Sequence, residues 1–402
     1  MLTYLIGVTQ TALVGIKDEA THGKYRRPIA NAYSLSSLKG YEPYIDQTIK
    51  DLTDVLDKRV EDRKPINMSS YLHYCEHSQG LRIRELTIHL GSFDVISKLT
   101  FGEPIGFISH GSDFNGMIKS QKGVFRYISI TNNMPLLDRL LKKNPILKLL
   151  GQQPNIFFQF ASRIVKQRVA QADVESAEAK GPKGKIHPDL LSSFIAARPS
   201  YPDIMTDLRI THYATTNVVA GANNSALAMD RTIHYLATHP DNQERLHREI
   251  TATKTDDLKD TEGPVALDLA LRMKYLEAII QESYRLFASP SNNLERVVSP
   301  AGLTLPNGVQ LPPGAVACMN GPSLMHRADI FGDDVNAFNP ERWMRQEGKE
   351  SEEEFTKRRL RMDRSMLPFG HGSRTCIGKN VVQLELYKIW PVLFKTYKVG
   401  AF

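Results

Sequence analysis

The chain has 402 residues, of which 41% are hydrophobic and 24% are charged. This balance is typical of a globular protein with a large core and excludes disorder as the main state. The net charge of +7 could attract nucleic acid, anionic lipid or an acidic protein. Because the sequence carries no zinc-finger or RNA-binding signature, we expect no nucleic-acid partner.

The three cysteines, Cys75, Cys318 and Cys376, leave one over if any two pair, and their spacing is not that of a zinc site. We therefore expect a reduced chain that faces the cytosol. The first residues are mildly apolar, but charged residues begin at Lys17, before the roughly 20 apolar residues that a membrane span needs. We expect no transmembrane anchor and no signal peptide.

Most of the first three hundred residues are predicted to be helical. Apolar residues recur at three- and four-residue spacing in stretches such as residues 44–60 and 156–170. Residues 172–188 are charged and small and are interrupted by Gly and Pro, so they predict a solvated loop.

A single long helix is predicted over residues 207–239, because this stretch contains no Pro and only one Gly, and Pro240 ends it. A second helix is expected around residues 268–287. Beyond it, short apolar segments alternate with Pro- and Gly-containing turns, which predicts strands at residues 296–298, 303–305 and 309–311. The predicted fold class is therefore mainly α with a small β region late in the chain.

The segment that decides the chemistry runs from Pro368 to Asn380 and surrounds Cys376. Its glycines let the backbone come close to a flat ligand. The apolar run over residues 381–390 predicts a helix that begins just after Cys376, and the positive end of that helix dipole favours a thiolate. The alternative is an ordinary glycine-rich turn with a buried cysteine.

This segment resembles the haem-binding signature of the cytochrome P450 family, whose positions recur here as Phe369, Gly370, Gly372, Arg374, Cys376 and Gly378. The resemblance implies that Cys376 is the axial ligand to the iron of haem b and that Arg374 meets a haem propionate. It also implies that Phe369 packs beside the sulfur, while Gly372 allows close approach to the cofactor. Thiolate ligation favours cleavage of the O–O bond.

Glu282 and Arg285 lie three residues apart on one predicted helical face, a spacing that alone usually marks a solvated pair. In the family, such a pair joins the arginine of a Pro-Glu-Arg segment in a buried network, and Arg342 occupies that place here. The resemblance implies a structural role for all three residues, which would lock the segment that leads to the cysteine loop.

His22 and Arg26 lie four residues apart in a segment that resembles one in which the family binds a haem propionate. Both side chains could donate to a carboxylate. Arg296 matches another propionate-binding arginine of the family. A basic surface turn is the alternative interpretation of the His22 segment.

The long helix departs from the family pattern. Gly221 in mid-helix costs about 1 kcal/mol relative to Ala, which close approach of the cofactor would explain, with tight helix packing as the alternative. Where the family has an acid and then a threonine for proton delivery, this chain has Asn223 and Asn224. An amide does not titrate near neutral pH, although it can hold a water, and Ser225 offers a hydroxyl one residue on. We expect Asn223, Asn224 and Ser225 to act as the catalytic residues of proton delivery.

The resemblance covers about residues 16–399, so we expect one haem-binding domain over residues 1–402. Family members also have a membrane anchor, a strand pair and further helices before the His22 segment, and a β hairpin after the last helix. The N-terminal sheet and helices and the C-terminal hairpin are therefore expected to be missing, which makes the domain incomplete at both ends.

Three further segments bear on partners. Residues 18–44, and especially residues 26–38, are similar to a fungal, pisatin-demethylase-like branch of the family, in which many members tailor secondary metabolites. Residues 125–150 are apolar enough to cover a hydrophobic pocket or to contact a membrane surface peripherally, with plain core as the alternative. The basic residues 357–361 could dock an acidic flavoprotein reductase, or form a solvated face.

We therefore predict a haem-thiolate monooxygenase that takes electrons from NADPH–cytochrome P450 reductase and uses O₂ to oxidise an apolar small molecule in fungal secondary metabolism. The resemblance implies a place on the cytosol-facing surface of the endoplasmic reticulum membrane. Asn223 and Asn224 leave open a haem-thiolate isomerase or ring-rearranging oxidase. The shortened ends leave open a degenerate, non-catalytic relative.

Overall fold

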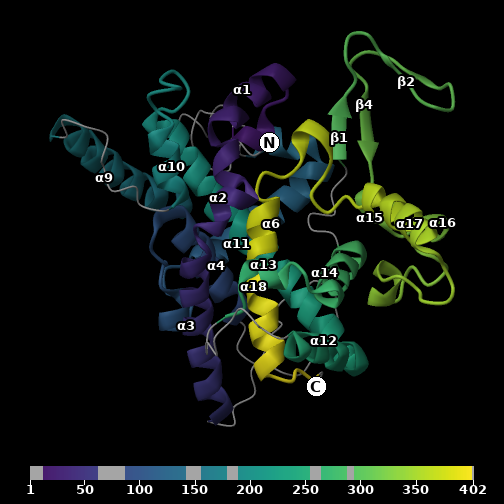
Figure 1. Ribbon diagram of the computed structural model, residues 1–402. Helices are drawn as coiled ribbons and strands as arrows, with labels where there is room; N and C mark the ends of the chain where they lie inside the picture. Colours follow the sequence, from purple (N-terminus) through teal and green to yellow (C-terminus); the bar gives the residue numbers. More distant parts are fainter. Residues whose placement is uncertain are drawn as a thin grey trace. The chain divides into compact units, whose positions relative to one another are not determined.

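A computed structural model gives the fold of the protein (Figure 1). It describes residues 12–61, 87–141, 155–178, 189–253, 264–287 and 294–400. Two compact units divide the chain. Unit 1 comprises Met1–Ala226, Glu262–Leu267 and Ile377–Ile389, and unit 2 comprises Leu227–Thr261, Asp268–Cys376 and Trp390–Phe402. The expected single domain over the whole chain stays a prediction.

All regular elements among the described residues of unit 1 are helices. Its elements are η2 (Leu13–Gly15), α1 (Glu19–Ala30), η3 (Asn31–Tyr33), α2 (Leu35–Lys39), α3 (Glu42–Glu61), α4 (Thr87–Phe101), α5 (Phe107–His110), α6 (Met117–Asn133), α7 (Pro135–Leu140), α9 (Ile156–Glu178), α10 (Leu190–Ala196) and the larger part of α11 (Asp207–Thr238). The beginning of α18 (Lys379–Thr396) also belongs to this unit.

Apolar residues at four-residue spacing give α11 its inner face. Ile210, Ala214, Val218 and Ala222 recur every four residues and are all buried. That spacing keeps them on one side of a helix, where burial of apolar surface stabilises the packing. Hydroxyls elsewhere on α11 bond to their own helix, as when Thr215 donates to the carbonyl four residues before it. The result is a rigid helix that presents residues 221–225 at a fixed place.

Unit 2 combines short helices with two small antiparallel sheets. Its elements are the end of α11, α12 (Pro240–Ala252), most of α13 (Leu267–Ala270), α14 (Lys274–Leu286), β1 (Leu294–Val297), β2 (Leu303–Thr304), β3 (Gln310–Leu311), β4 (Val316–Met319), α15 (Gly321–Met325), α16 (Ala328–Phe331), η5 (Pro340–Trp343), α17 (Glu352–Ser365), η6 (Gly372–Arg374) and the end of α18.

The strands form two nested hairpins. Strand β1 pairs with β4, with Leu294 opposite Met319, and β2 pairs with β3 inside the connection between them (Figure 1). The helical part of unit 2 packs on an apolar cluster that includes Phe331, Trp343 and Met362. This arrangement confirms the predicted fold class, mainly α with a small β region late in the chain.

Local boundaries depart from the sequence predictions where tertiary contacts decide them. Helix α11 is confirmed over Asp207–Thr238, but α14 begins only at Lys274. The Glu249 carboxylate accepts from the amides of Tyr275 and Leu276 at 2.8 and 2.9 Å, which fixes that beginning. The predicted strands appear in slightly different bounds, and β4 was missed because it is short and largely exposed.

The predicted loop over residues 172–188 is wrong in its first part. Helix α9 continues to Glu178, because residues 172–178 contain neither Gly nor Pro to stop it. The rest of that prediction lies outside the described residues. Among the helices that are described, none has both the length and the apolar character needed to cross a membrane.

Candidate functional site

Cys376 lies at the end of a tight loop in unit 2, just before α18 in the chain. The loop turns at Gly370, with φ of 69°, and at Gly372, with φ of 71°, a backbone region that favours glycine. The Cys376 amide donates to the Phe369 carbonyl at 2.8 Å and holds the loop closed. Cys376 is exposed. An accessible sulfur donor on a preformed loop fits a haem iron.

The other predicted residues of unit 2 differ in how firmly they are held. The Phe369 ring contacts the Tyr284 ring edge-on, with centroids 5.1 Å apart, so α14 packs against the loop. Arg374 is half-buried beside Cys376 in the chain. Arg296 is exposed on β1 and donates to the Glu295 carbonyl at 2.7 Å. The fixed loop and the exposed arginine are compatible with an anionic ligand, such as a haem propionate.

Glu282, Arg285 and Arg342 are brought together in one buried network. The two arginines donate to the Glu282 carboxylate at 2.8 and 2.9 Å, and all three side chains are at most 5% exposed. The Trp343 indole and the Asn339 amide donate to the same carboxylate at 2.8 and 3.0 Å. A buried carboxylate with this many donors is well satisfied.

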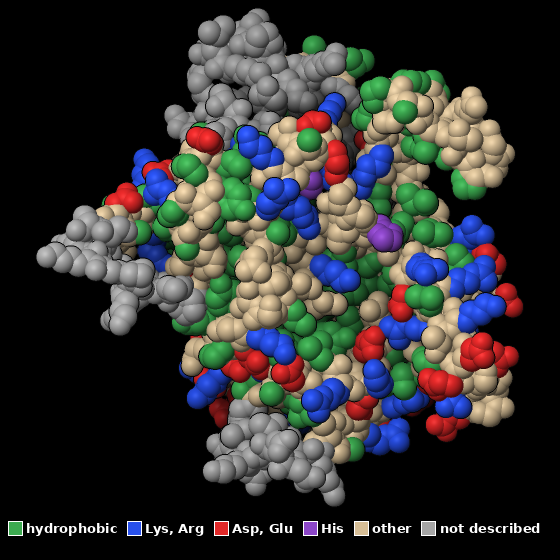
Figure 2. Space-filling model, turned by 45° about the horizontal axis from the view of Figure 1, so that its top comes forward, with side chains coloured by type: hydrophobic (Ala, Val, Ile, Leu, Met, Phe, Trp, Pro, Cys, Tyr) green, Lys and Arg blue, Asp and Glu red, His purple; other side chains and the backbone are tan. Residues whose placement is uncertain are grey.

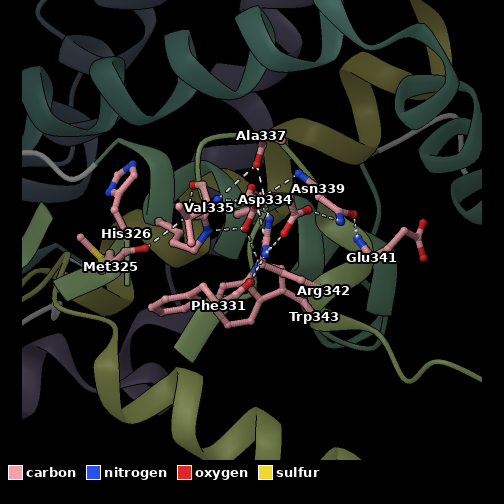
Figure 3. Close-up of polar contacts among 12 residues, drawn as sticks. Met325, His326, Phe331, Asp334, Val335, Ala337, Asn339, Glu341, Arg342 and Trp343 are labelled. Carbon is pink, nitrogen blue, oxygen red and sulfur yellow. Dashed lines mark hydrogen bonds and ion pairs between the residues drawn. The ribbon is translucent and has the colours of Figure 1, made fainter. Parts of the chain in front are cut away.

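The remaining donors of the two arginines clamp the chain between α15 and η5. Figure 3 shows Arg342 among the residues of this segment, with dashed lines for the polar contacts. Arg285 donates to the carbonyls of Met325, Val335 and Ala337. Arg342 donates to the Phe331 carbonyl and to the Asp334 carboxylate. The network therefore fixes the path of the segment that precedes α17 and the cysteine loop.

His22 and Arg26 lie one turn apart on α1 in unit 1, as the sequence predicted. His22 is buried and Arg26 is half-buried. Helix α11 holds α1 by two contacts at Tyr25: the Tyr213 hydroxyl donates to its carbonyl at 2.7 Å, and the Arg209 guanidinium lies 4.3 Å from its ring centre. These contacts give the His22–Arg26 pair a fixed orientation.

Gly221 is explained by packing within unit 1. A Cβ atom at this position would lie 2.7 Å from the Ile96 side chain of α4, closer than real contacts allow. Helices α4 and α11 therefore approach each other at a point where only glycine fits. The expected role of Gly221 beside the cofactor stays a prediction.

The two asparagines after Gly221 lie on different sides of α11. Asn223 is buried, whereas the Asn224 amide turns back and donates to the Ala220 carbonyl at 2.9 Å. The neighbouring Val219 carbonyl accepts from Gln121 of α6 at 2.7 Å. Ser225 is buried at 1% exposure. Side-chain amides thus bond two consecutive carbonyls of α11 next to the predicted catalytic residues.

A buried acid near Ser225 was missed by the sequence analysis. Glu385 lies on α18, and its burial raises the pKa to about 8, while the Ser225 side chain acts in the opposite direction. Within the described residues, neither the Ser225 hydroxyl nor the Glu385 carboxyl meets the geometry of a direct hydrogen bond. A lone acid in the apolar run over residues 381–390 was the available signal.

A second buried ionisable group on α18, Lys388, is paired with acids. The Lys388 ammonium lies 2.6 Å from Glu42 and 2.8 Å from Asp46, and it donates to the Val265 carbonyl at 2.6 Å. Burial raises the pKa of Asp46, and Lys388 opposes that shift. This cluster ties α18 to α3 within unit 1 and serves as a structural anchor.

The basic residues 357–361 lie on α17, and most of their side chains form ion pairs with acidic residues. Three arginines form ion pairs there: Arg358 with Glu350 at 2.6 Å, Arg359 with Glu277 at 2.7 Å, and Arg361 with Asp329 at 3.0 Å. Figure 2 shows Lys and Arg side chains interspersed with Asp and Glu on the face it presents. Lys357 and Arg364 remain exposed.

The apolar residues over 125–141 are largely at the surface and not in the core. Large apolar side chains of α6, α7 and the residue between them are between 47% and 72% exposed: Ile130, Met134, Leu136 and Leu140. Residues 142–150 of the predicted apolar stretch lie outside the described residues.

Comparisons with known proteins identify the family. A family model for cytochrome P450 matches residues 2–401. A cytochrome P450 monooxygenase of Aspergillus terreus is 29% identical over 395 residues, which cover 96% of this chain and 72% of the relative. Monooxygenase cicH of Emericella nidulans is 30% identical over 406 residues, covering 100% of this chain and 73% of the relative. Monooxygenase cfoH of Aspergillus candidus is 30% identical, and the chain spans 66% of its length.

A solved structure supports the fold. The crystal structure of a cytochrome P450 (CYP102L1) has a TM-score of 0.69 at 20% identity and covers 98% of this chain and 75% of that chain. The chain therefore belongs to the cytochrome P450 family. It is a monooxygenase and therefore an oxidoreductase. Membership of the family implies a haem cofactor, O₂, a redox partner and a small-molecule substrate.

Replacing Glu282 tests the buried network. Glu282→Gln keeps the size of the side chain but leaves the buried Arg285 without a counter-charge and Arg342 with only the partly exposed Asp334, so we expect a loss of about 3–5 kcal/mol in the free energy of unfolding. Urea denaturation measures it. The control is Arg345→Gln, which breaks the exposed Arg345–Glu352 pair and is expected to have little effect. Equal effects of the two substitutions would contradict a special role for the network.

A double-mutant cycle tests the packing at Gly221. Gly221→Ala is expected to destabilise the chain by about 1–3 kcal/mol, because the new methyl group overlaps Ile96. Ile96→Ala makes room, so the double variant should lose less than the sum of the two single losses. Strict additivity in thermal or urea unfolding would show that the two residues do not compete for space.

The stability of the protein is expected to fall as pH rises because of Glu385. Folding raises its pKa from 4.5 to about 8, so between these values the folded chain holds a proton that the unfolded chain has released. The contribution is at most about 1.4 kcal/mol per pH unit, is favourable at low pH, and levels off above the higher value. Urea midpoints of Glu385→Gln should lack this slope. Parallel pH curves for the two proteins would exclude the raised pKa.

Proposed function

We propose that the chain binds haem b through the thiolate of Cys376 and catalyses insertion of one atom of O₂ into an apolar small molecule, while the other atom leaves as water. The observation that carries this proposal is the exposed Cys376 on a loop that is closed by its own amide and turned by two glycines. Haem with a thiolate ligand supplies O–O bond cleavage.

The residues around the cofactor would share its binding. Arg374 and Arg296 would donate to the haem propionates, and so would His22 and Arg26, whose helix is oriented by the contacts at Tyr25. Phe369, supported by Tyr284, would pack beside the sulfur and keep water from it. Gly372 would admit the cofactor close to the backbone.

Two groups of residues would serve the reaction without binding the cofactor. Glu282, Arg285 and Arg342 keep a structural role, since their network fixes the segment that leads to the cysteine loop. Asn223 and Asn224 would hold a water near the oxygen-activation step, and Ser225 would relay a proton through its hydroxyl.

The substrate and partners follow from the family and the surface. Relatives from Aspergillus and Emericella favour a role in fungal secondary metabolism. NADPH–cytochrome P450 reductase would deliver the electrons, and exposed cations of α17 such as Lys357 and Arg364 would serve such a contact. The exposed apolar side chains of α6 and α7 favour a peripheral contact with the cytosolic face of the endoplasmic reticulum membrane.

A second candidate is a haem-thiolate isomerase or ring-rearranging oxidase. It is favoured by Asn223 and Asn224, because neither side chain can supply a proton by titration near neutral pH. Mass analysis of the product formed under ¹⁸O₂ separates the two hypotheses, since an isomerase gives unlabelled product and a monooxygenase incorporates one labelled atom.

The proposed ligand is tested by the absorption spectrum of the reduced, carbon-monoxide-bound protein. Wild type is expected to show the long-wavelength Soret band of thiolate-ligated haem, and Cys376→Ala is expected to lose it. The control is Cys318→Ala, which removes the other described cysteine and should keep the band. The same band in Cys376→Ala as in wild type would rule out ligation by this sulfur.

A further inference from the structure

Tyr284 on α14 contacts the cysteine loop through its ring. The Tyr284 and Phe369 rings lie edge to face, with centroids 5.1 Å apart and planes inclined by 75°. Tyr284 is 9% exposed and Phe369 is half-buried. An edge-to-face pair is directional, because the positive edge of one ring is attracted to the negative face of the other. The contact therefore fixes the orientation of the Phe369 ring as well as its position.

The helix that carries Tyr284 leaves this ring little freedom. Tyr284 lies between Glu282 and Arg285 in the chain, and the side chains of these two residues are 0% exposed and form an ion pair at 2.8 Å. An earlier turn of α14 is tied to α17 by the ion pair between Glu277 and Arg359 at 2.7 Å. Movement of the backbone at position 284 would disturb the buried pair, which is costly. The Tyr284 ring is therefore a fixed support.

Phe369 transmits this constraint to Cys376 through the backbone. The Phe369 carbonyl accepts from the Cys376 amide at 2.8 Å. Between the two residues the chain turns at Gly370 and Gly372, with φ of 69° and 71°. Because glycine has many accessible backbone conformations, contacts at the ends of the loop have to select one of them. A rotation of Phe369 would move its carbonyl and change the hydrogen bond that holds Cys376.

On the basis of the proposed ligation of iron by Cys376, we infer that Tyr284 is a positioning residue for this ligand. Its ring fixes Phe369, and Phe369 fixes the loop that presents the sulfur. Helix α14 thus acts on the cysteine loop itself, in addition to carrying the ionic network that fixes the segment before the loop. Tyr284 lies outside the loop sequence, and its role follows from the contact between the two rings.

The expected consequence concerns the electron density on the sulfur. Hydrogen bonds to a thiolate and water near it withdraw electron density, and this raises the reduction potential of the bound iron. Under the proposed function, the Phe369 ring beside the sulfur keeps water away and holds the potential low. A loop that lacks the support of Tyr284 would admit water to the sulfur. The potential should then rise, and the thiolate should be protonated more readily.

The experiment uses the haem-loaded full chain and measures two quantities. These are the reduction potential of the iron and the rate at which the reduced, carbon-monoxide-bound form loses its long-wavelength Soret band. Tyr284→Leu removes the ring, so we expect a higher potential and a several-fold faster loss of the band. Tyr284→Phe keeps the ring and should match wild type in both. An equal shift in Tyr284→Phe would assign the effect to the hydroxyl and overturn the inference.

A matched control lies on the same helix. Tyr275 is also a buried tyrosine of α14, but its ring centre lies 4.3 Å from the Arg245 guanidinium and its hydroxyl donates to Asn242 at 3.2 Å. Tyr275→Leu should lower the free energy of unfolding without changing the reduction potential or the rate of band loss. Shifts as large as those of Tyr284→Leu would show that any loss of packing on α14 disturbs the sulfur, and the specific role of Tyr284 would be refuted.

A double-mutant cycle tests the route through Phe369. Phe369→Leu should raise the potential as Tyr284→Leu does, and the double variant should shift no further than Phe369→Leu alone, because the two rings act as one unit. Additive shifts would mean that Tyr284 acts on the sulfur by another route, which contradicts the inference. If Tyr284→Leu does not retain haem, Tyr284→Met takes its place in the cycle, since it fills more of the space but has no ring.

The outcomes separate this inference from the proposed function. A wild-type chain without the long-wavelength band would overturn the proposed function and the inference with it. A normal band in wild type, together with a potential and a rate of band loss in Tyr284→Leu that equal those of wild type, would overturn the inference alone. Ligation by Cys376 would then stand without the support of Tyr284.

Discussion

The path of the chain toward its cysteine depends on one buried carboxylate. Glu282 receives two guanidinium groups, an indole and a backbone amide, and the same two arginines reach carbonyls from α15 to η5. A charge in this position is tolerable only while every partner is present, because an isolated buried ion is strongly unfavourable. Few backbone paths allow residues 325–343 to bond to both arginines while the arginines bond to Glu282. The network therefore fixes the segment before the cysteine loop.

Glu385 is also a buried glutamate, but unlike Glu282 it is accommodated in its neutral form. No cation of the described residues neutralises it, so burial is the largest influence on its pKa and the side chain is neutral near pH 7. Lys388, one turn further along α18, meets two acids instead. Two neighbouring positions of one helix therefore carry groups with different tasks. The paired charge holds the helix in place, and the acid without an ion pair keeps its proton near pH 7.

The features that the sequence predicted well are those that depend on residues close together in the chain. The absence of Pro from residues 207–239 sufficed for α11, and the spacing of Gly370, Gly372 and Cys376 sufficed for a turned loop before a helix. Prediction failed where a distant residue decides, as when Glu249 fixes the beginning of α14. It also failed for Glu385, since nothing along the chain reveals that an acid in an apolar run faces a serine on another helix. The roles of the individual haem-site residues stay predictions.

Under the proposed function, the amides at positions 223 and 224 would change the demand on proton supply rather than remove it. An acid on α11 would be ionised unless buried, and an ionised group beside an apolar substrate raises the cost of binding that substrate. Two amides leave this stretch of α11 without charge. A carboxyl with a pKa of about 8, such as that of Glu385, is protonated in roughly nine of ten molecules at pH 7. Under the proposed function, a neutral surface at positions 223 and 224 would therefore rely on another group, such as the Ser225 hydroxyl, to pass a proton.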